Sequence, residues 1–469
     1  MNNMYFFNLL RSRKITPTQL ALFSRSPVVG AWWEELKSQG LFKDKRPEDT
    51  ELDKQLFIDG LRHEEVLIKK LKKKGFRIAE LEGKQTECNY KATKQAMSDG
   101  YDFIWQASLN NEEMRGSADL LRKVQGSSPF GNWSYQPIEC KLSSKTKTTF
   151  LVQACAYCDL LSPLLQKRPK QFELYLGGGK FKEFETDKFW YWYQLLRERY
   201  RDFQNSFNPN NVPLDAPGDH GSWATFIQER LEASRDLMTV AKMRQTQRLK
   251  LKEAGIHTID DLAQLKEGVK IQGLRQEALY DLKEQAKLQV KPKGPDGKPN
   301  YLLKKIIEGK GLTILPKQNQ GDIWFDLEGV QNPVFGTQLE YLIGLCYKNE
   351  SDDSCIYKAW WAHSPSEEKQ AFENWVQWVE NRLKRYPDLK IYHYGSYEKT
   401  AIRRLAQQYS TKEIIIDQWL RYSLLVDLLP IVTGSIVLGE NSYSIKKVEK
   451  LYMESRGADV KTAGDSVVA

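Results

Sequence analysis

Ile138-Glu139-Cys140-Lys141 is the stretch that decides the fold of the first third of the chain, because it sets two charged residues two positions apart in a short apolar-flanked run. If this run is a β-strand, the side chains of Glu139 and Lys141 leave the same face. Asp119 belongs to a second such run, residues 116–124, and a sheet could bring it to Glu139. Two carboxylates on adjacent strands can share one Mg²⁺, which prefers oxygen ligands. A lysine beside them can orient or activate an attacking water, while the metal stabilises charge on a phosphate.

Two further motifs flank these runs: a Gly-x-x-His-Glu sequence at residues 60–64, and Gln153 with Tyr157 at positions i and i+4, which share one face of a helix. Taken singly, each motif has an ordinary alternative: a solvated strand face, a surface His-Glu pair, or a tyrosine at the edge of a core. In their order along the chain, G-x-x-H-E, G-x-x-D, E-x-K and Q-x-x-x-Y resemble the RecB-type branch of the PD-(D/E)XK nucleases. The resemblance implies an α/β, restriction-endonuclease-like N-terminal domain.

The resemblance also implies roles for the residues that match the family pattern. Asp119 and Glu139 would be metal ligands for Mg²⁺ or Mn²⁺, with His63 as a further ligand, and Lys141 would be the catalytic lysine.

Three further positions complete the implied nuclease site. Glu64 would support the site, and Gln153 and Tyr157 would position the nucleic acid.

The composition agrees with a nucleic-acid enzyme without establishing one. Lys and Arg number 70 against 61 Asp and Glu, a net charge of +9 that favours a polyanionic partner. Aromatic residues make up 12% of the chain, and some could stack on bases. We expect DNA as the partner, with RNA as the alternative. No helicase motor motif is recognised, which leaves open a separate helicase partner.

The length and the N-terminal sequence bear on organisation and location. A chain of 469 residues predicts two to four domains. Neither an apolar run of membrane-spanning length nor a signal-peptide pattern in residues 1–16 is recognised. We therefore expect a cytoplasmic protein with no membrane partner.

The cysteines bear on one alternative cofactor. Cys155 and Cys158 form a C-x-x-C pair, which can mark a metal site, although both thiols could equally be small buried groups of a helix. Some RecB-like nucleases hold an iron–sulfur cluster through one upstream and three downstream cysteines. Residues 24–26 contain no cysteine where those relatives place one, and none lies between positions 158 and 346. We therefore expect no iron–sulfur cluster.

A helical middle section is predicted after the first domain, with boundaries at 1–205, 206–304 and 305–469. Residues 251–262 and 271–275 resemble a helix-hairpin-helix unit, in which Gly255 and Gly273 would form turns and Thr258 would cap a helix. Such turns can offer backbone N–H groups to phosphate, so Gly255, Gly273 and Arg275 are candidate nucleic-acid contacts. A helical connector with no ligand is the open alternative.

A second carboxylate pattern begins at residue 323. Asp326 and Glu328 stand two apart in an apolar strand, so they share one face. The pattern resembles the first motif of DnaQ-like exonucleases, within the ribonuclease H-like fold, and more specifically a YprB-type domain. The resemblance implies metal-binding roles for these two residues and for Glu398, Asp427 and Asp465. As a whole, the chain resembles a family of RecB-like putative nucleases.

Two departures from the family pattern weaken the assignment of a second metal site. Glu398 stands where the family has aspartate, and Asp465 lies four residues before the last residue, Ala469. The alternatives are a truncated, weakly metal-binding or silent centre, or simply polar residues at a strand end. Overall we expect a divalent-metal-dependent nuclease acting on DNA in repair, recombination or defence, with the N-terminal domain as principal centre. The alternatives are an exonuclease working through the C-terminal domain and a non-catalytic nucleic-acid-binding scaffold.

Overall fold

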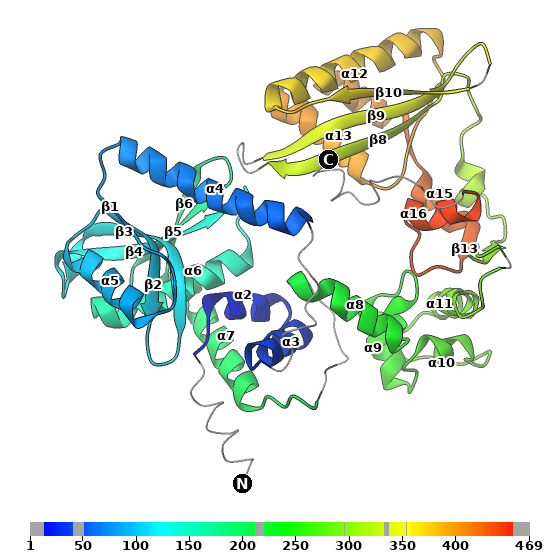
Figure 1. Cartoon of the computed structure of the whole chain (residues 1–469). Helices are drawn as coiled ribbons and strands as arrows, with labels where there is room; N and C mark the ends of the chain where they lie inside the picture. The colour runs from blue at the N-terminus through cyan, green and yellow to red at the C-terminus, as the bar shows by residue number, and fades with distance from the viewer. Residues whose placement is uncertain are drawn as a thin grey trace. The chain divides into compact units, whose positions relative to one another are not determined.

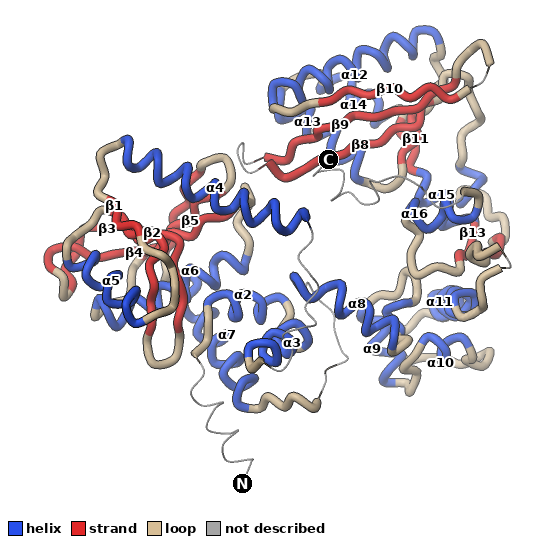
Figure 2. The backbone as a smooth tube through the Cα atoms, in the orientation of Figure 1, coloured by secondary structure: helices blue, strands red, loops and turns tan. Residues whose placement is uncertain are grey.

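The computed structural model describes residues 14–40, 51–211, 213, 220–294, 296–332, 337–352 and 354–453. The chain forms two compact units, one comprising Met1–Gln228 with Gln331–Thr337, the other mainly Glu229–Val330 and Gln338–Val467. Both units combine helices with β-sheet (Figures 1 and 2). The finer division into three parts at residues 205 and 304 stays a prediction.

The described part of the first unit contains a six-stranded sheet in the order β1-β2-β3-β4-β5-β6. The strands are β1 (Ile78–Glu80), β2 (Phe103–Asn110), β3 (Arg115–Ser128), β4 (Gly131–Lys141), β5 (Gln171–Leu176) and β6 (Lys180–Glu185). The β1–β2 and β4–β5 pairs are parallel, whereas the other neighbours are antiparallel. The strands predicted over residues 116–124 and 138–141 are therefore confirmed as the adjacent strands β3 and β4.

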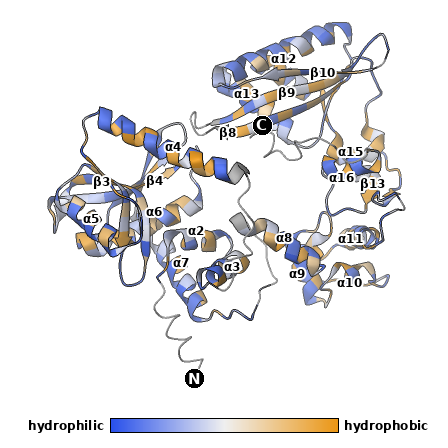
Figure 3. Cartoon of the chain, in the orientation of Figure 1, coloured by the Kyte–Doolittle hydropathy of each residue, from blue (hydrophilic) through white to orange (hydrophobic). Residues whose placement is uncertain are grey.

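Helices cover both faces of this sheet, because successive strand residues point to opposite sides. Phe103 of β2 packs with Leu67 and Leu71 of one long helix, α4, whereas its neighbour Ile104 packs with Val152 of another, α6. Figure 3 shows hydrophobic residues distributed along α4. The helices are α2 (Pro17–Arg25), α3 (Val29–Ser38), α4 (Glu51–Lys73), α5 (Glu87–Ser98), α6 (Thr148–Leu165), α7 (Asp187–Asn205), the 3-10 helix η2 (Gly221–Trp223) and α8 (Ala224–Ala233).

Helix α6 corrects one sequence expectation. By length and composition alone it could cross a membrane, although no such run is recognised in the sequence. Cys155, Cys158 and Leu161 of α6 are fully buried in the core of the first unit. Packing against the sheet therefore explains its apolar composition, and a buried core helix passes the same length test.

The described part of the second unit contains a five-stranded sheet in the order β10-β9-β8-β11-β12. Its strands are β8 (Ile323–Asn332), β9 (Thr337–Lys348), β10 (Cys355–Trp361), β11 (Ile391–His393) and β12 (Leu425–Asp427). β11 runs parallel to both β8 and β12, and β10 is antiparallel to β9. Helices α12 (Pro365–Arg385), α13 (Tyr397–Tyr409) and α14 (Glu413–Arg421) complete a shared core with this sheet, in which Phe325 stacks on Trp375 at 4.5 Å.

A helical segment precedes this sheet in the second unit. It consists of η3 (Leu237–Thr239), α9 (Gln245–Glu253), α10 (Ile259–Ala263) and α11 (Gln276–Gln289), which share their own core. Thr258 caps α10 by accepting a hydrogen bond from the backbone N–H of Asp261 at 3.1 Å, as predicted.

Short elements connect the helical segment to the end of the chain. β7 (Tyr301–Leu303) pairs antiparallel with β13 (Ile436–Leu438), and Gln285 of α11 donates a hydrogen bond to the carbonyl of Leu438 at 2.6 Å. The remaining elements are η4 (Gly311–Ile314), α15 (Leu428–Ser435), α16 (Ile445–Val448) and η5 (Glu449–Leu451).

Candidate active site

Three charged side chains from β3 and β4 meet in the first unit. The Lys141 ammonium lies 2.7 Å from Glu139 Oε2 and 3.9 Å from Asp119 Oδ2. The backbone N–H of Cys140 donates to Asp119 Oδ2 at 2.8 Å, which fixes this carboxylate against the neighbouring strand. The structure thus brings together three residues that the sequence pattern singles out.

Glu64 of α4 belongs to the same group, and two residues of β2 hold it there. Glu64 Oε2 accepts hydrogen bonds from Trp105 Nε1 at 3.0 Å and from Gln106 Nε2 at 2.7 Å. Gln106 has a φ of 55°, a left-handed backbone conformation that is uncommon for a residue with a side chain. Sequence reasoning missed Trp105 and Gln106, because their role depends on β2 lying beside β3 and beneath α4, which no local pattern reveals.

The charges of this group are unbalanced. Glu64, Asp119 and Glu139 carry three negative charges when ionised, against one positive charge on Lys141. Burial and the Asp119 charge raise the pKa of Glu64 to about 7, and the same two causes raise the pKa of Glu139. Burial alone would lower the pKa of Lys141, but the Glu139 and Asp119 charges outweigh it and raise that pKa. The group therefore favours additional positive charge, either protons or a cation.

The donor set fits a divalent cation with few protein ligands. Glu139 is 1% exposed, and its Oε1 is a buried oxygen with no hydrogen-bond partner among the described residues. In those same residues, no three His, Cys, Asp or Glu side chains are grouped closely enough to form a ligand set. Mg²⁺ usually keeps several water ligands and binds through one or two carboxylates. Asp119 and Glu139 supply that number.

His63 lies outside these contacts, although it is the neighbour of Glu64 in sequence. Its Nε2 faces the carbonyl oxygen of Tyr175 at 3.4 Å, and its ring stacks on the Tyr175 ring at 4.5 Å. Burial lowers the pKa of His63. Consecutive helix residues point in different directions, which explains the separation. A ligand role for His63 stays a prediction.

Tyr157 and Gln153 occupy one face of α6, as predicted. The Tyr157 hydroxyl donates to the carbonyl of Ser117 at 2.6 Å, two residues before Asp119. A Cβ on Gly116 would lie 3.1 Å from the Tyr157 ring and 2.8 Å from Pro17, so glycine permits this close approach. Gln153 is half-buried, and no side-chain hydrogen bond is found for it within the described residues. Their roles toward nucleic acid stay predictions.

The second carboxylate group lies in the five-stranded sheet. Asp326 of β8 interacts with Glu398 at the start of α13, and burial together with the Glu398 charge raises the pKa of Asp326 to about 6, although part of its side chain meets solvent. Glu398 is buried, with Oε2 3.3 Å from Nδ1 of the buried His393. Glu328 lies near Lys446 and Glu340, and burial raises its pKa.

Asp427 is held by the backbone. Its Oδ1 accepts hydrogen bonds from the N–H groups of Gly395 at 2.8 Å and Leu429 at 2.9 Å, so it caps α15. The described contacts thus pair Asp326 with Glu398 more directly than they join Asp427 to either. Asp465 lies outside the described residues.

A buried carboxylate that the sequence did not reveal supports this second group. Glu340 of β9 is fully buried and accepts hydrogen bonds from Tyr397 and Arg404. A Cβ on Gly329 would lie 2.1 Å from Glu340 Oε2, so the glycine after the Asp-x-Glu motif leaves room for that carboxylate.

The helix-hairpin-helix candidates lie at turns. Gly255 and Gly273 have φ values of 81° and 72°, the left-handed conformation that favours glycine. The Gly273 carbonyl accepts a hydrogen bond from Lys250, and Arg275 precedes the first turn of α11.

Comparison with known proteins identifies one part of the chain. Residues 323–469 match the model of the RNase H superfamily. The C-terminal part is an RNase H-like domain. The matched range contains the strands β8 to β12 and the carboxylates Asp326, Glu328, Glu398 and Asp427. No curated protein matches the chain.

Proposed function

We propose that the protein is a divalent-metal-dependent nuclease that hydrolyses phosphodiester bonds of DNA, with its principal centre on β3, β4 and α4. The RNase H-like domain suggests a nucleic-acid substrate. The observation that carries the proposal is the group formed by Glu64, Asp119, Glu139 and Lys141, with its deficit of positive charge and the unpartnered Glu139 Oε1. The order of these residues supports a RecB-type PD-(D/E)XK assignment for the first unit.

Each residue of this group would have a different role in hydrolysis of the phosphodiester bond. Asp119 and Glu139 would hold the cation, which when bound supplies charge stabilisation at the phosphate and a more acidic water. Lys141 is kept protonated by the two carboxylates, so it acts as a hydrogen-bond donor to a phosphate oxygen or to the attacking water. Glu64 has a pKa of about 7 and is fixed by Trp105, which suits it to accept a proton near neutral pH.

The C-terminal domain is the alternative centre. The paired Asp326 and Glu398 carboxylates favour a cation there, since burial and the Glu398 charge raise the pKa of Asp326. Asp427 is already bound through Oδ1 by two backbone N–H groups. Glu398 Oε2, like Glu139 Oε1, is buried with no hydrogen-bond partner among the described residues.

A matched pair of variants separates the two centres. Asp119→Asn and Asp326→Asn each remove one charge from one carboxylate group at nearly constant shape. Cleavage of labelled single- and double-stranded DNA and RNA is measured with Mg²⁺ or Mn²⁺, with EDTA as control. We expect Asp119→Asn and Lys141→Ala to lower the rate at least ~100-fold while folding is retained, because the residues of one site act as a unit.

The reverse pattern, in which only Asp326→Asn abolishes cleavage, would transfer the activity to the RNase H-like domain. Absence of metal-dependent cleavage from the wild-type protein on all substrates would leave a non-catalytic nucleic-acid-binding protein.

A further inference from the structure

A pocket of about 870 Å³ lies in the second unit, between α9, α11 and the segment that follows β7, and no residue of either carboxylate group lines it. Four of its basic side chains come from the helical segment: Lys242, Arg244, Lys250 and Arg275. Only Arg275 among them is a residue that the sequence analysis selects. The pocket brings Arg275 together with basic residues at least 25 positions away in the sequence.

Three more basic side chains, Lys304, Lys305 and Lys310, complete the lining, against only Asp281 and Glu284. Seven positive and two negative groups give a formal lining charge of +5. Glu284 already pairs with Lys287 at 2.7 Å. Within the described residues, none of the seven basic groups has a carboxylate partner within 4.0 Å. The pocket therefore gathers positive charge that the protein itself does not neutralise.

Two of these lysines converge on a single carbonyl. The ammonium groups of Lys304 and Lys242 lie 2.9 and 3.4 Å from the backbone oxygen of Thr433. Burial and the Lys304 charge lower the pKa of Lys242 to about 8, although Asp281 partly offsets this. Lys242 also has a φ of 68°, an uncommon conformation for a residue with a side chain. Bringing like charges together has a free-energy cost that an anionic ligand would relieve.

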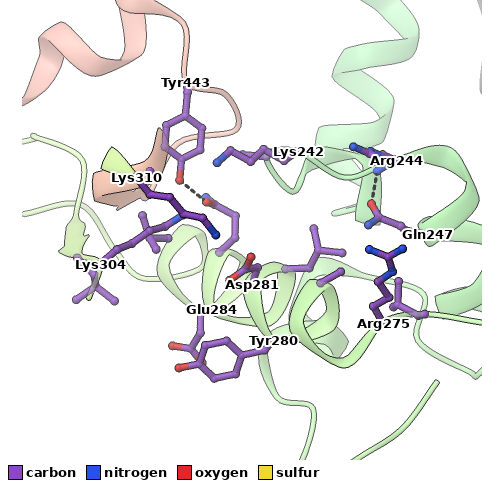
Figure 4. A pocket seen from close by; sticks show the side chains of 18 of the residues that line it. Lys242, Arg244, Gln247, Arg275, Tyr280, Asp281, Glu284, Lys304, Lys310 and Tyr443 are labelled. Carbon is purple, nitrogen blue, oxygen red and sulfur yellow. Dashed lines mark hydrogen bonds between the residues drawn. The ribbon is translucent and has the colours of Figure 1, made fainter. Parts of the chain in front are cut away.

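The arrangement of the charges matches an extended ligand. In Figure 4, Lys304 and Lys310 lie on one side of the pocket and Arg244 and Arg275 on the other, with Lys242 between them. A single phosphate group would leave most of a pocket of about 870 Å³ unfilled, whereas consecutive phosphates of a nucleic-acid backbone could use the charges on both sides.

Exposed apolar side chains accompany the charges. Tyr280 is 62% exposed and Leu303 is 75% exposed, and both line the pocket. Aromatic side chains beside a basic groove stack on unpaired bases, whereas a duplex keeps its bases in its own stack. The combination therefore favours a single strand over a duplex.

We propose that this pocket binds the phosphodiester backbone of single-stranded nucleic acid, with Tyr280 stacking on a base. The proposal deepens the nuclease function proposed above, since it gives the substrate strand a binding site outside the carboxylate groups.

Two charge-matched variants of the full chain test the site. The pocket variant is Arg275→Gln/Lys305→Gln/Lys310→Gln, three exposed residues of the lining. The control is Lys266→Gln/Lys270→Gln/Lys369→Gln, which removes three exposed charges that do not line the pocket. Anisotropy of a labelled oligothymidylate of about 20 nucleotides reports binding in EDTA, so that cleavage does not interfere.

We expect the pocket variant to bind at least tenfold more weakly at about 0.1 M salt. Its plot of log affinity against log salt should be shallower by about 2, because three phosphate contacts are lost. The control should change affinity less than threefold. Tyr280→Ala should weaken binding at least fivefold through lost stacking, and Lys242→Gln/Lys304→Gln should act in the same direction as the pocket variant.

Three results would overturn the proposal. The first is an equal loss of affinity in the pocket and control variants, and the second is pocket-dependent binding of a duplex as tight as that of the single strand. The third is displacement of the labelled strand by inorganic phosphate at a concentration equal to that of the strand's own phosphate groups. Cleavage with Mg²⁺ is measured separately. Pocket-dependent binding without any cleavage would overturn the nuclease function and leave the pocket assigned. Cleavage by the wild-type protein together with binding that does not depend on the pocket would overturn the pocket proposal and leave the nuclease function standing.

Discussion

At the scale of single residues, we predict that the raised pKa of Glu64 makes the stability of the protein depend on pH. Its pKa of about 7 in the folded protein exceeds the ordinary value of 4.5. Between about pH 4.5 and 7 the folded state therefore binds more protons than the unfolded state, and stability falls as pH rises through this window. Glu64→Gln keeps an oxygen that can accept from Trp105 and Gln106 but removes the charge. In EDTA at pH 8 we expect it to be more stable than wild type by on the order of 2 kcal/mol, with no gain at pH 4.5.

Thermal melts at the two pH values measure this difference. Glu65→Gln is the matched control, because Glu65 is exposed and its one ion pair among the described residues is with Lys69 at 3.7 Å. An exposed pair of this kind contributes little to stability. If Glu64→Gln shows the same change in melting temperature at both pH values, its carboxyl does not titrate in this window.

The sequence could indicate which residues matter at this scale but not how they are held. Glu139 and Lys141 were paired correctly because strand alternation alone puts them on one face. His63 was grouped with Glu64 by motif, but the structure turns it toward Tyr175. Trp105 and Gln106 could not be found, since their hydrogen bonds to Glu64 join residues about 40 positions apart.

At the scale of elements, we predict that replacing two glycines by alanine changes the free energy of unfolding in opposite directions, because their surroundings differ. A Cβ on Gly329 of β8 would lie 2.1 Å from Glu340 Oε2 and 2.8 Å from the Tyr397 hydroxyl. Glu340 is fully buried and accepts hydrogen bonds from the Tyr397 hydroxyl, so Gly329→Ala should destabilise the second unit by about 2–4 kcal/mol. Around Gly60 in α4 nothing lies within 4 Å. There alanine should stabilise the helix by about 0.5–1 kcal/mol.

Denaturant melts of the two variants, followed by circular dichroism, measure both signs. A destabilised Gly60→Ala would mean that this face of α4 contacts another part of the protein. A neutral Gly329→Ala would mean that β8 can move away from Glu340.

Long elements with strong patterns were predictable, whereas short paired ones were not. Apolar runs in the sequence located β3, β4 and β8. The pairing of β7 with β13 had no sequence signal, because each strand has three residues and more than 130 positions separate them. The basic pocket was not predicted from the sequence for the same reason, because its lining depends on the pairing of β7 with β13.

At the scale of the whole molecule, net charge proved a coarse guide. The excess of +9 indicated a polyanionic partner without locating it. Arg248 counts toward that excess, yet it is fully buried and binds Asp236 through Nε and Nη2, both at 2.7 Å, so it stabilises the helical segment. The charge that matters for a ligand is the part left without carboxylate partners, which the sequence cannot distinguish.

The last prediction uses metal binding to locate the working centre in the intact chain. A cation that binds only the folded state stabilises it by about 2.7 kcal/mol at 100 times its Kd. With Mn²⁺ or Mg²⁺ at that excess, amides of β3 and β4 that exchange through unfolding should exchange about 100-fold more slowly. Hydrogen exchange read by mass spectrometry assigns the effect to peptides. Asp119→Asn should abolish it in β3 and β4, and Asp326→Asn should leave it there unchanged. Protection confined to β8 and β11 instead would show that the cation binds the Asp326–Glu398 pair, and the RNase H-like domain would then be the metal-dependent centre.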